Sequence, residues 1–183
     1  MNKHDLKNLL DWVLHIVLAI ALGLLITVFL GRLTVVDGNS MNSTLQNGDV
    51  IIIEAVTPRF GTIQSGDIVV LKIPELLENR KKYAIKRVIA TENEHVEIRD
   101  GKVFIDGSEL SEPYVSAGAG ETAVENSLYA DITVPEGCIY VLGDNRIPDK
   151  SRDSRAFGPV STDRILGKSW IRIFPFSNAG YVR

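Results

Sequence analysis

Residues 83–89 read Tyr-Ala-Ile-Lys-Arg-Val-Ile, an apolar run interrupted by two adjacent cations, Lys86 and Arg87. Short runs rich in β-branched and aromatic residues favour strands. Similar runs recur along the chain between breaks that contain glycine, aspartate or proline. They span residues 50–53, 68–71, 96–98, 103–105, 139–142 and 169–174. The sequence therefore predicts a mostly β domain, with Asp100-Gly101 as the turn of a hairpin.

The two cations differ in what they could do inside such a strand. Alternation places Lys86 and Arg87 on opposite faces, and both faces are otherwise apolar. At least one of them is then expected to be buried and paired. Arginine stays protonated in proteins, whereas burial lowers the pKa of a lysine, so a base at this position would be Lys86. Two solvated cations on an edge strand would give the same pattern.

The composition limits the classes of partner. The 183 residues suffice for one domain with a core. Lysine and arginine total 20 and aspartate and glutamate total 23, giving a net charge of -3, so we expect no nucleic acid partner. Cys138 is the only cysteine, which excludes an internal disulfide, and its apolar neighbours predict a buried side chain.

An apolar segment precedes the β runs. Residues 12–30 are apolar except for His15 and Thr27, and about 20 apolar residues span a bilayer as a helix. We therefore predict one transmembrane anchor over 12–31. The alternative is a cleaved signal peptide, whose apolar core is usually about 7–15 residues long and ends in an Ala-x-Ala-like site. The run here is longer, and no such site follows it.

Flanking charges predict the orientation of the anchor. Lys3 and Lys7 precede it and only Arg32 follows closely, so the positive-inside rule places residues 1–11 in the cytoplasm and 32–183 outside. An exported domain without disulfides is typical of a bacterial surface, and we expect a Gram-positive cell membrane.

Just beyond the anchor, residues 38–45 read Gly-Asn-Ser-Met-Asn-Ser-Thr-Leu. Most serines in such turns bond only to nearby backbone, so Ser40 is either a turn residue or a nucleophile. Ser40 follows Leu30 by ten residues, which keeps it within about 35 Å of the end of the anchor. A nucleophilic serine needs a base. The histidines are poorly placed for that role, and Lys86 is the substitute.

A polar cluster follows the run at 139–142. Residues 143–158 read Gly-Asp-Asn-Arg-Ile-Pro-Asp-Lys-Ser-Arg-Asp-Ser-Arg-Ala-Phe-Gly. This could be a solvated charged loop. Alternatively, Asp153 and Arg155 lock a buried turn, and a serine hydroxyl in it orients a neutral lysine amine.

Together the three clusters resemble those of the bacterial type I signal peptidases, membrane-bound Ser/Lys endopeptidases that remove signal peptides from exported proteins. The nucleophile motif of that family, Ser-Met-x-Pro-Thr-Leu, corresponds to residues 40–45, with Ser43 in place of proline. Its general base stands in a strand that ends in Lys-Arg, which corresponds to Lys86 and Arg87.

The last family signature is Gly-Asp-Asn…Ser-x-Asp-Ser-Arg-x-(aromatic)-Gly, which corresponds to residues 143–145 and 151–158. Residues 147–150 make the gap between its two halves longer than usual. The resemblance extends over roughly residues 12–175.

The resemblance implies that Ser40 attacks the scissile carbonyl and that Lys86 is the general base. Met41 would line the substrate groove, and Gly38 stands where some family members place an oxyanion-hole serine. Supporting positions would be Arg87, Asp144, Asn145, Ser151, Asp153 and Arg155, with Ser151 orienting the Lys86 amine.

The resemblance also implies a coiled, mostly antiparallel β-structure with an apolar surface beside the bilayer. A hairpin and loop over approximately 91–140 would be inserted between the lysine and Gly-Asp-Asn motifs. The partners would be secretory preproteins, cut after small residues at the first and third positions before the bond, and the lipid bilayer. No metal or organic cofactor is implied.

Two rival functions share features with this sequence. Self-cleaving repressors also use a Ser/Lys pair, but they carry a DNA-binding domain where this chain has an apolar segment. A non-general or weakly catalytic relative dedicated to surface-fibre (pilin) assembly would be expected to lose the serine or the lysine, and both Ser40 and Lys86 are present.

Overall fold

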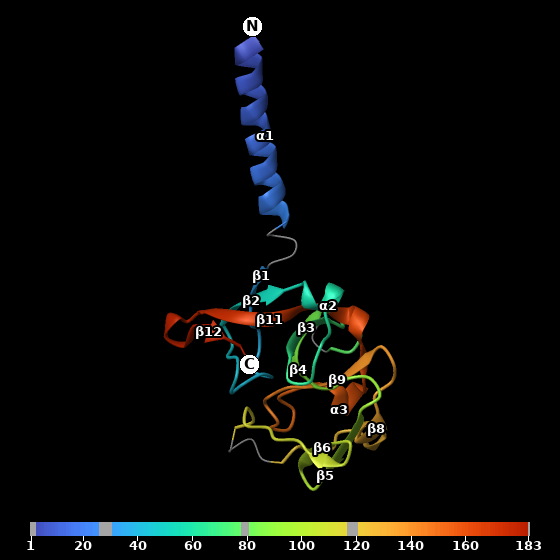
Figure 1. Cartoon of the computed structure of the whole chain (residues 1–183). Coiled ribbons are helices and arrows are strands. Elements are labelled where there is room, and N and C mark those ends of the chain that lie inside the picture. Colours follow the sequence, from blue (N-terminus) through green and yellow to red (C-terminus); the bar gives the residue numbers. More distant parts are fainter. Residues whose placement is uncertain (1–2, 26–30, 78–80, 117–120, 183) are drawn as a thin grey trace.

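The computed structural model describes residues 3–25, 31–77, 81–116 and 121–182. One N-terminal helix, α1 (Lys3–Leu25), stands apart from a β-structure made of two antiparallel sheets (Figure 1). The prediction of a mostly β domain is therefore confirmed.

The larger sheet has eight strands in the order β1-β2-β11-β3-β4-β9-β10, with β12 paired to β11. Register shifts interrupt the pairing of β11 with β2 and β3 and of β4 with β9. Such irregularities bend strands, and the sheet curls into a half-barrel. Its strands are β1 (Arg32–Val35), β2 (Val50–Glu54), β3 (Ile68–Lys72), β4 (Tyr83–Ala90), β9 (Cys138–Leu142), β10 (Val160–Ser161), β11 (Ile165–Phe174) and β12 (Gly180–Tyr181).

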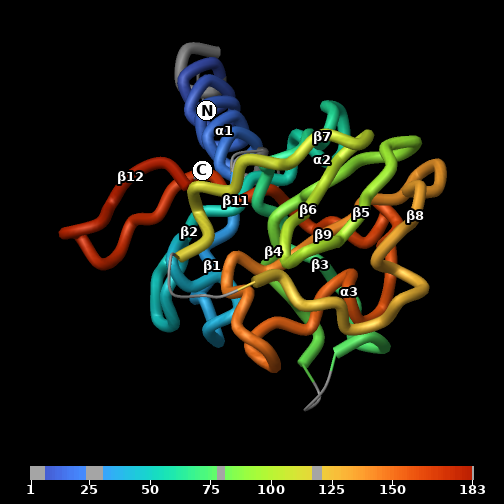
Figure 2. The backbone as a smooth tube through the Cα atoms, turned by 90° about the horizontal axis from the view of Figure 1, so that it is seen from below, coloured from blue at the N-terminus to red at the C-terminus, as the bar shows by residue number. Residues whose placement is uncertain are grey.

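The smaller sheet lies at the end of the β-structure farthest from α1 (Figure 1), and Figure 2 views the molecule from that end. Asp100 and Gly101 join two of its strands with φ values of 50° and 73°. Positive φ at both positions is the requirement of a type I′ turn, so the predicted hairpin is confirmed. In spatial order the strands are β7 (Ser108–Glu109), β6 (Lys102–Ile105), β5 (His95–Arg99) and β8 (Asp131–Thr133).

Short helices fill the connections. The two α-helical turns are α2 (Thr57–Phe60) and α3 (Ser154–Phe157), and 3-10 turns cover Ser127–Tyr129, Thr162–Arg164 and Phe176–Asn178. Asp153 caps α3 by accepting a hydrogen bond from the backbone N–H of Arg155 at 3.3 Å. The predicted 143–158 cluster therefore contains a turn that its own side chains close.

Three groups of buried apolar side chains hold these elements together. The first packs β3 and β4 against β9 and includes Val69, Leu71, Val88 and Val141. The second joins the two sheets. It brings Ile89, Tyr140 and Leu142 of the larger sheet against Val96, Ile98 and Val103 of the smaller one. The third anchors the turn that follows β1, through Val36, Met41, Leu45 and Ile51.

All seven predicted strand runs correspond to strands of the structure. The interpretation of Lys86 and Arg87 as solvated cations on an edge strand is wrong, because β4 lies between β3 and β9 and the two residues are 3% and 2% exposed. Cys138 is half-buried rather than buried, at the start of β9.

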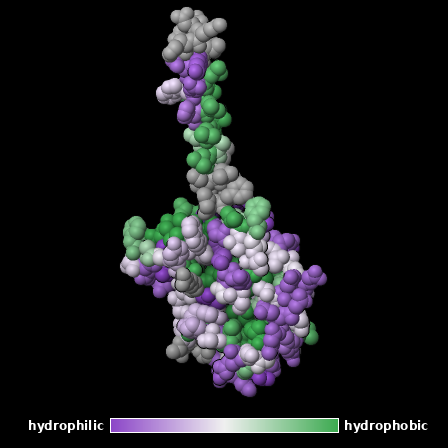
Figure 3. Space-filling model, viewed as in Figure 1, coloured by the Kyte–Doolittle hydropathy of each residue, from purple (hydrophilic) through white to green (hydrophobic). Residues whose placement is uncertain are grey.

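Helix α1 starts at Lys3, before the predicted anchor, and ends at Leu25. Residues 26–30 of the predicted anchor lie outside the described residues. In the part of the chain that the structure describes, no helix combines the length and the apolar character needed to cross a membrane. Figure 3 shows hydrophobic side chains along α1 and on parts of the β-structure nearest to it.

The core around Leu71 gives a test of the fold. Leu71 is fully buried at 0% exposure, so Leu71→Ala should lower the free energy of unfolding by about 2–5 kcal/mol through lost burial and a residual cavity. Leu128→Ala is the control, because Leu128 is 73% exposed. Denaturant unfolding of both variants in detergent measures the difference, and equal stabilities would contradict this packing.

Candidate active site

Ser40 lies half-buried in the turn between β1 and β2. Two apolar side chains of this turn are packed in the core, since Met41 and Leu45 are 1% and 0% exposed. Its backbone closes on itself, with the N–H groups of Thr44 and Leu45 donating to the Met41 carbonyl at 2.9 and 2.8 Å. The buried Met41 and Leu45 therefore anchor the turn, and Ser40 next to Met41 stays half-buried.

The loop after β9 also binds this turn through hydrogen bonds. The backbone N–H of Asn145 donates to the Ser40 carbonyl at 3.0 Å, and its side-chain amide donates to the Asn39 carbonyl at 2.9 Å. Gly143 is required there, because a Cβ at that position would overlap the Ser40 carbonyl oxygen and Ser151 Oγ. The predicted motifs around Ser40 and Asn145 are thus in direct contact.

Lys86 reaches the third cluster from β4. Its Nζ donates to Ser151 Oγ at 3.1 Å, and Ser151 Oγ donates to Asp153 Oδ2 at 2.7 Å. The Ser151 hydrogen is directed at the carboxylate, so an oxygen lone pair faces the lysine. This chain of bonds fixes the position of the amine with a neutral partner.

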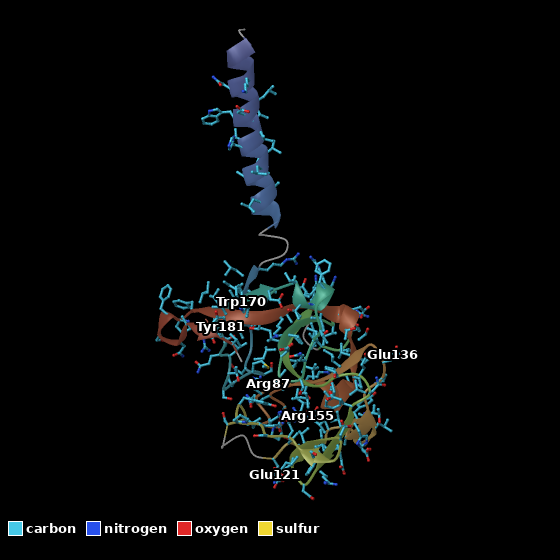
Figure 4. All side chains as sticks on the ribbon, viewed as in Figure 1. Arg87, Glu121, Glu136, Arg155, Trp170 and Tyr181 are labelled. Carbon is cyan, nitrogen blue, oxygen red and sulfur yellow. The ribbon has the colours of Figure 1, made fainter. Side chains whose placement is uncertain are left out.

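Two buried ion pairs flank Lys86. Arg87 donates to Asp144 through Nε at 2.8 Å and Nη2 at 2.7 Å. Arg155 likewise makes a bidentate pair with Asp153, donating through Nε at 2.8 Å and through Nη2 at 2.9 Å. Bidentate pairs of this kind hold their groups in fixed orientations, and Figure 4 shows Arg87 and Arg155 inside the β-structure.

A cavity of about 490 Å³ joins the predicted catalytic residues. Gly38, Ser40, Met41 and Lys86 all line it. Outside this lining are the other predicted residues, Arg87, Asp144, Asn145, Ser151, Asp153 and Arg155.

Residues from two strand regions line the cavity. Residues 34–36, at the end of β1 and directly after it, and residues 83–85 of β4 line it. Within the described sheet β1 is an end strand that pairs with β2, and the 83–87 part of β4 is registered against β3. Strand edges of this kind can accept an extended peptide by main-chain hydrogen bonding.

The family model described as signal peptidase, peptidase S26, matches residues 9–174. The chain belongs to this family. Signal peptidase I of Bacillus licheniformis is 35% identical over 181 residues, which cover 96% of this chain and 93% of that protein. Signal peptidase I T of Bacillus subtilis (strain 168) is 35% identical over 180 residues, covering 96% and 90%.

Two further members of the signal peptidase family are similar to this chain. Signal peptidase IB of Staphylococcus aureus (strain MRSA252) is 29% identical over 187 residues, covering 96% of this chain and 94% of that protein. A crystal structure of a signal peptidase I from Enterococcus faecalis V583 matches with a TM-score of 0.46 and 32% identity, covering 58% of this chain and 96% of that one.

In this signal peptidase chain, burial sets the protonation of the lysine. Loss of water around the ammonium lowers the pKa of Lys86 from 10.5 to about 8. The negative charge of Asp153 opposes this shift, and the positive charge of Arg155 adds to it. Because these two charges are paired with each other, burial dominates, and an appreciable share of the amine is neutral near pH 8.

Asp153 stays ionised in the same environment. Burial by itself raises its pKa, but hydrogen bonds from Arg155 and the charge of that guanidinium more than offset burial and hold the pKa below its ordinary value. The backbone N–H of Gly143 also donates to its Oδ2, at 3.0 Å. The acceptor that orients Ser151 is therefore a carboxylate across the neutral pH range.

Some residues of the site were not singled out from the sequence. Thr44 donates through its hydroxyl to Asp144, and Arg146 is fully buried with its Nε bonded to the Gly143 carbonyl at 2.8 Å. Both belong to motifs already quoted, so their presence near the site could have been anticipated. Tyr114 stacks on Arg87, and no sequence motif marks Tyr114 as part of the site.

The charge balance around Lys86 can be tested by titration. Asp153→Asn removes the negative charge that raises the pKa of Lys86 and leaves Arg155 in place, so the pKa should fall below about 8. NMR of 13C-labelled lysine side chains in the detergent-solubilised chain measures it. Asp163→Asn is the matched control, since that carboxylate is 74% exposed and outside the cavity lining. An unchanged or raised Lys86 pKa in Asp153→Asn contradicts this account.

Proposed function

We propose that this chain is a serine endopeptidase that removes signal peptides from exported preproteins, with Ser40 as nucleophile and Lys86 as general base. The main observation in support is that Ser40 lines the same cavity as Lys86, a buried lysine whose pKa is lowered to about 8. The match to the signal peptidase family supports the same reaction.

The proposed mechanism uses the lysine twice. Neutral Lys86 takes the proton from Ser40 Oγ as that oxygen attacks the scissile carbonyl. The resulting ammonium then protonates the leaving amine, and the acyl group stays on Ser40 as an ester. Lys86, neutral again, activates the water that hydrolyses the ester. Ser151 keeps the amine in place throughout, since its hydroxyl accepts one N–H of Lys86.

The oxyanion would be stabilised at the turn itself. The backbone N–H of Gly38 donates to Asn47 Oδ1 at 2.9 Å and is directed away from this task. We therefore assign one donor to the Ser40 N–H, as the usual position for a serine nucleophile. Gly38 adopts a φ of 112°, a region that favours glycine, and lines the cavity without a side chain.

The substrate is proposed to enter as an extended strand between 34–36 and 83–85, with small residues at the first and third positions before the cut. Met41 would form the floor of the groove, since it is buried and lines the cavity. A weakly catalytic relative dedicated to pilin assembly is not favoured, because Ser40 and Lys86 are both retained and the similar chains are named as signal peptidases.

We further propose that residues 12–31 anchor the chain in a bacterial cell membrane, with 1–11 in the cytoplasm and 32–183 outside. Apolar side chains of α1 are extensively exposed, for example Trp12 at 72% and Leu18 at 66%. The side of the β-structure toward α1 carries Trp170 and Tyr181, as Figure 4 shows. The relatives from Bacillus and Staphylococcus are consistent with a Gram-positive membrane.

Cleavage of a purified preprotein tests the catalytic assignment. Ser40→Ala and Lys86→Met should each abolish cleavage, because one removes the nucleophile and the other the base, while the melting temperature shows that the fold persists. Ser161→Ala, an exposed residue on β10, is the matched control and should cleave normally. In the unsubstituted chain kcat/KM should rise with pH through about 8 as Lys86 loses its proton. Clear turnover by Ser40→Ala would refute the assignment.

Protease accessibility tests the proposed anchor. In intact protoplasts, added protease should digest residues 32–183 and spare an epitope tag placed at the N-terminus. The tag should become sensitive only after the membrane is permeabilised, and carbonate washing should leave the chain in the membrane fraction. Release by carbonate, or digestion of the tag in intact protoplasts, would contradict the anchor or its orientation.

A further inference from the structure

A segment distant in sequence contacts the turn that carries Ser40. Ser43 Oγ, three residues after the nucleophile, donates a hydrogen bond to the Tyr114 carbonyl. The ring of the same tyrosine covers the Arg87 guanidinium, with 3.9 Å from Arg87 Cζ to the ring centroid. Tyr114 therefore contacts both the nucleophile turn and the neighbour of the proposed base.

Two side chains hold Tyr114 in this position. Its hydroxyl donates to Glu112 Oε1 at 2.9 Å, and Glu112 accepts from Arg146 through both terminal nitrogens, one of them at 3.0 Å. Arg146 is fully buried and also donates to Thr122 Oγ1 at 2.8 Å. Burial, together with the adjacent Glu112 carboxylate, raises the pKa of Tyr114, so its hydroxyl remains a donor at neutral pH.

The turn needs such a support because of the residue at position 43. The family motif has proline there, and proline would fix φ near -65°. Serine leaves that angle free, so the contact of its side chain adds to the buried Met41 and Leu45 in fixing the geometry of the turn. Here that contact is the carbonyl of Tyr114, whose side chain is held by Glu112, which Arg146 binds in turn.

We propose that Ser43, Tyr114 and Glu112 are positioning residues that hold the Ser40 turn in its reactive geometry. This inference rests on the proposed function, because the reaction of Ser40 is what the positioning serves. None of the three residues lines the cavity. Their loss should therefore lower the fraction of molecules with Ser40 correctly oriented and leave the binding of a preprotein nearly unchanged.

The first test removes the hydroxyl. Ser43→Ala should lower kcat for preprotein cleavage about three- to tenfold, the effect of losing one net hydrogen bond, and leave KM within about twofold. Ser43→Thr keeps the hydroxyl and should restore most of kcat. Ser108→Ala, an exposed serine on β7 outside the cavity lining, is the matched control and should leave kcat unchanged.

Hydrogen exchange measured by mass spectrometry supplies a readout that does not depend on cleavage. Peptides covering 39–45 should exchange faster in Ser43→Ala than in the unsubstituted chain, because the N–H bonds of Thr44 and Leu45 to Met41 open more often. Exchange in β3 should stay the same. Ser43→Ala with unchanged exchange at 39–45, or with unchanged kcat in an active enzyme, overturns the proposal.

A double variant tests whether Tyr114 acts through Ser43. Tyr114→Leu removes the ring from Arg87 and should displace the carbonyl, so adding Ser43→Ala should change exchange at 39–45 little further. Fully additive effects would overturn the coupling. If the unsubstituted chain cleaves no preprotein while Ser43→Ala still speeds exchange, the proposed function fails and the support of the turn stands.

Discussion

The structure of the site depends on one constraint, the burial of the Lys86 amine beside a hydroxyl rather than a carboxylate. A buried ammonium facing an unpaired carboxylate would be held in its charged form. Here the carboxylate behind Ser151 belongs to Asp153, whose charge is balanced by Arg155 at 2.8 Å. Ser151 therefore orients the amine with a hydrogen bond, and burial is left to lower its pKa to about 8. The position of the Lys86 amine is thus set by Ser151, and its basicity is set mainly by burial.

The half-barrel assembles this arrangement from segments distant in sequence. Strand β4 carries Lys86 and pairs with β9, so the loop after β9 is delivered beside the lysine. That loop, through Asn145, binds the backbone of the Ser40 turn. Gly143 permits the close approach, because a Cβ there would overlap both Ser40 and Ser151 atoms. The pairing of β4 with β9 and the small size of Gly143 thus bring Lys86 and the Ser40 turn to the same loop.

Much of this could be predicted from the sequence, and the exceptions have two physical reasons. The strands were predictable because β-branched runs and turn residues are local signals, as at Asp100-Gly101. Ser40, Lys86 and the 143–158 cluster stood out as polar groups within or beside apolar runs. The short strands β7, β10 and β12 carry too few residues to show a pattern. The contact of Tyr114 with Arg87 arises only in the fold, since no local pattern links residues that far apart.

The buried charges show why the site tolerates so many ionisable groups near a neutral lysine. Asp153 pairs with Arg155, Asp144 with Arg87, and Glu112 with Arg146. Each pair is almost neutral at a distance, so its field at Lys86 is far weaker than that of a single charge. The pairs can therefore hold their side chains in fixed orientations by bidentate bonds without fixing the protonation of the lysine. Replacing Asp153 or Arg155 leaves the other as an uncompensated charge beside Lys86, so this pair influences the basicity of the lysine although neither residue lines the cavity.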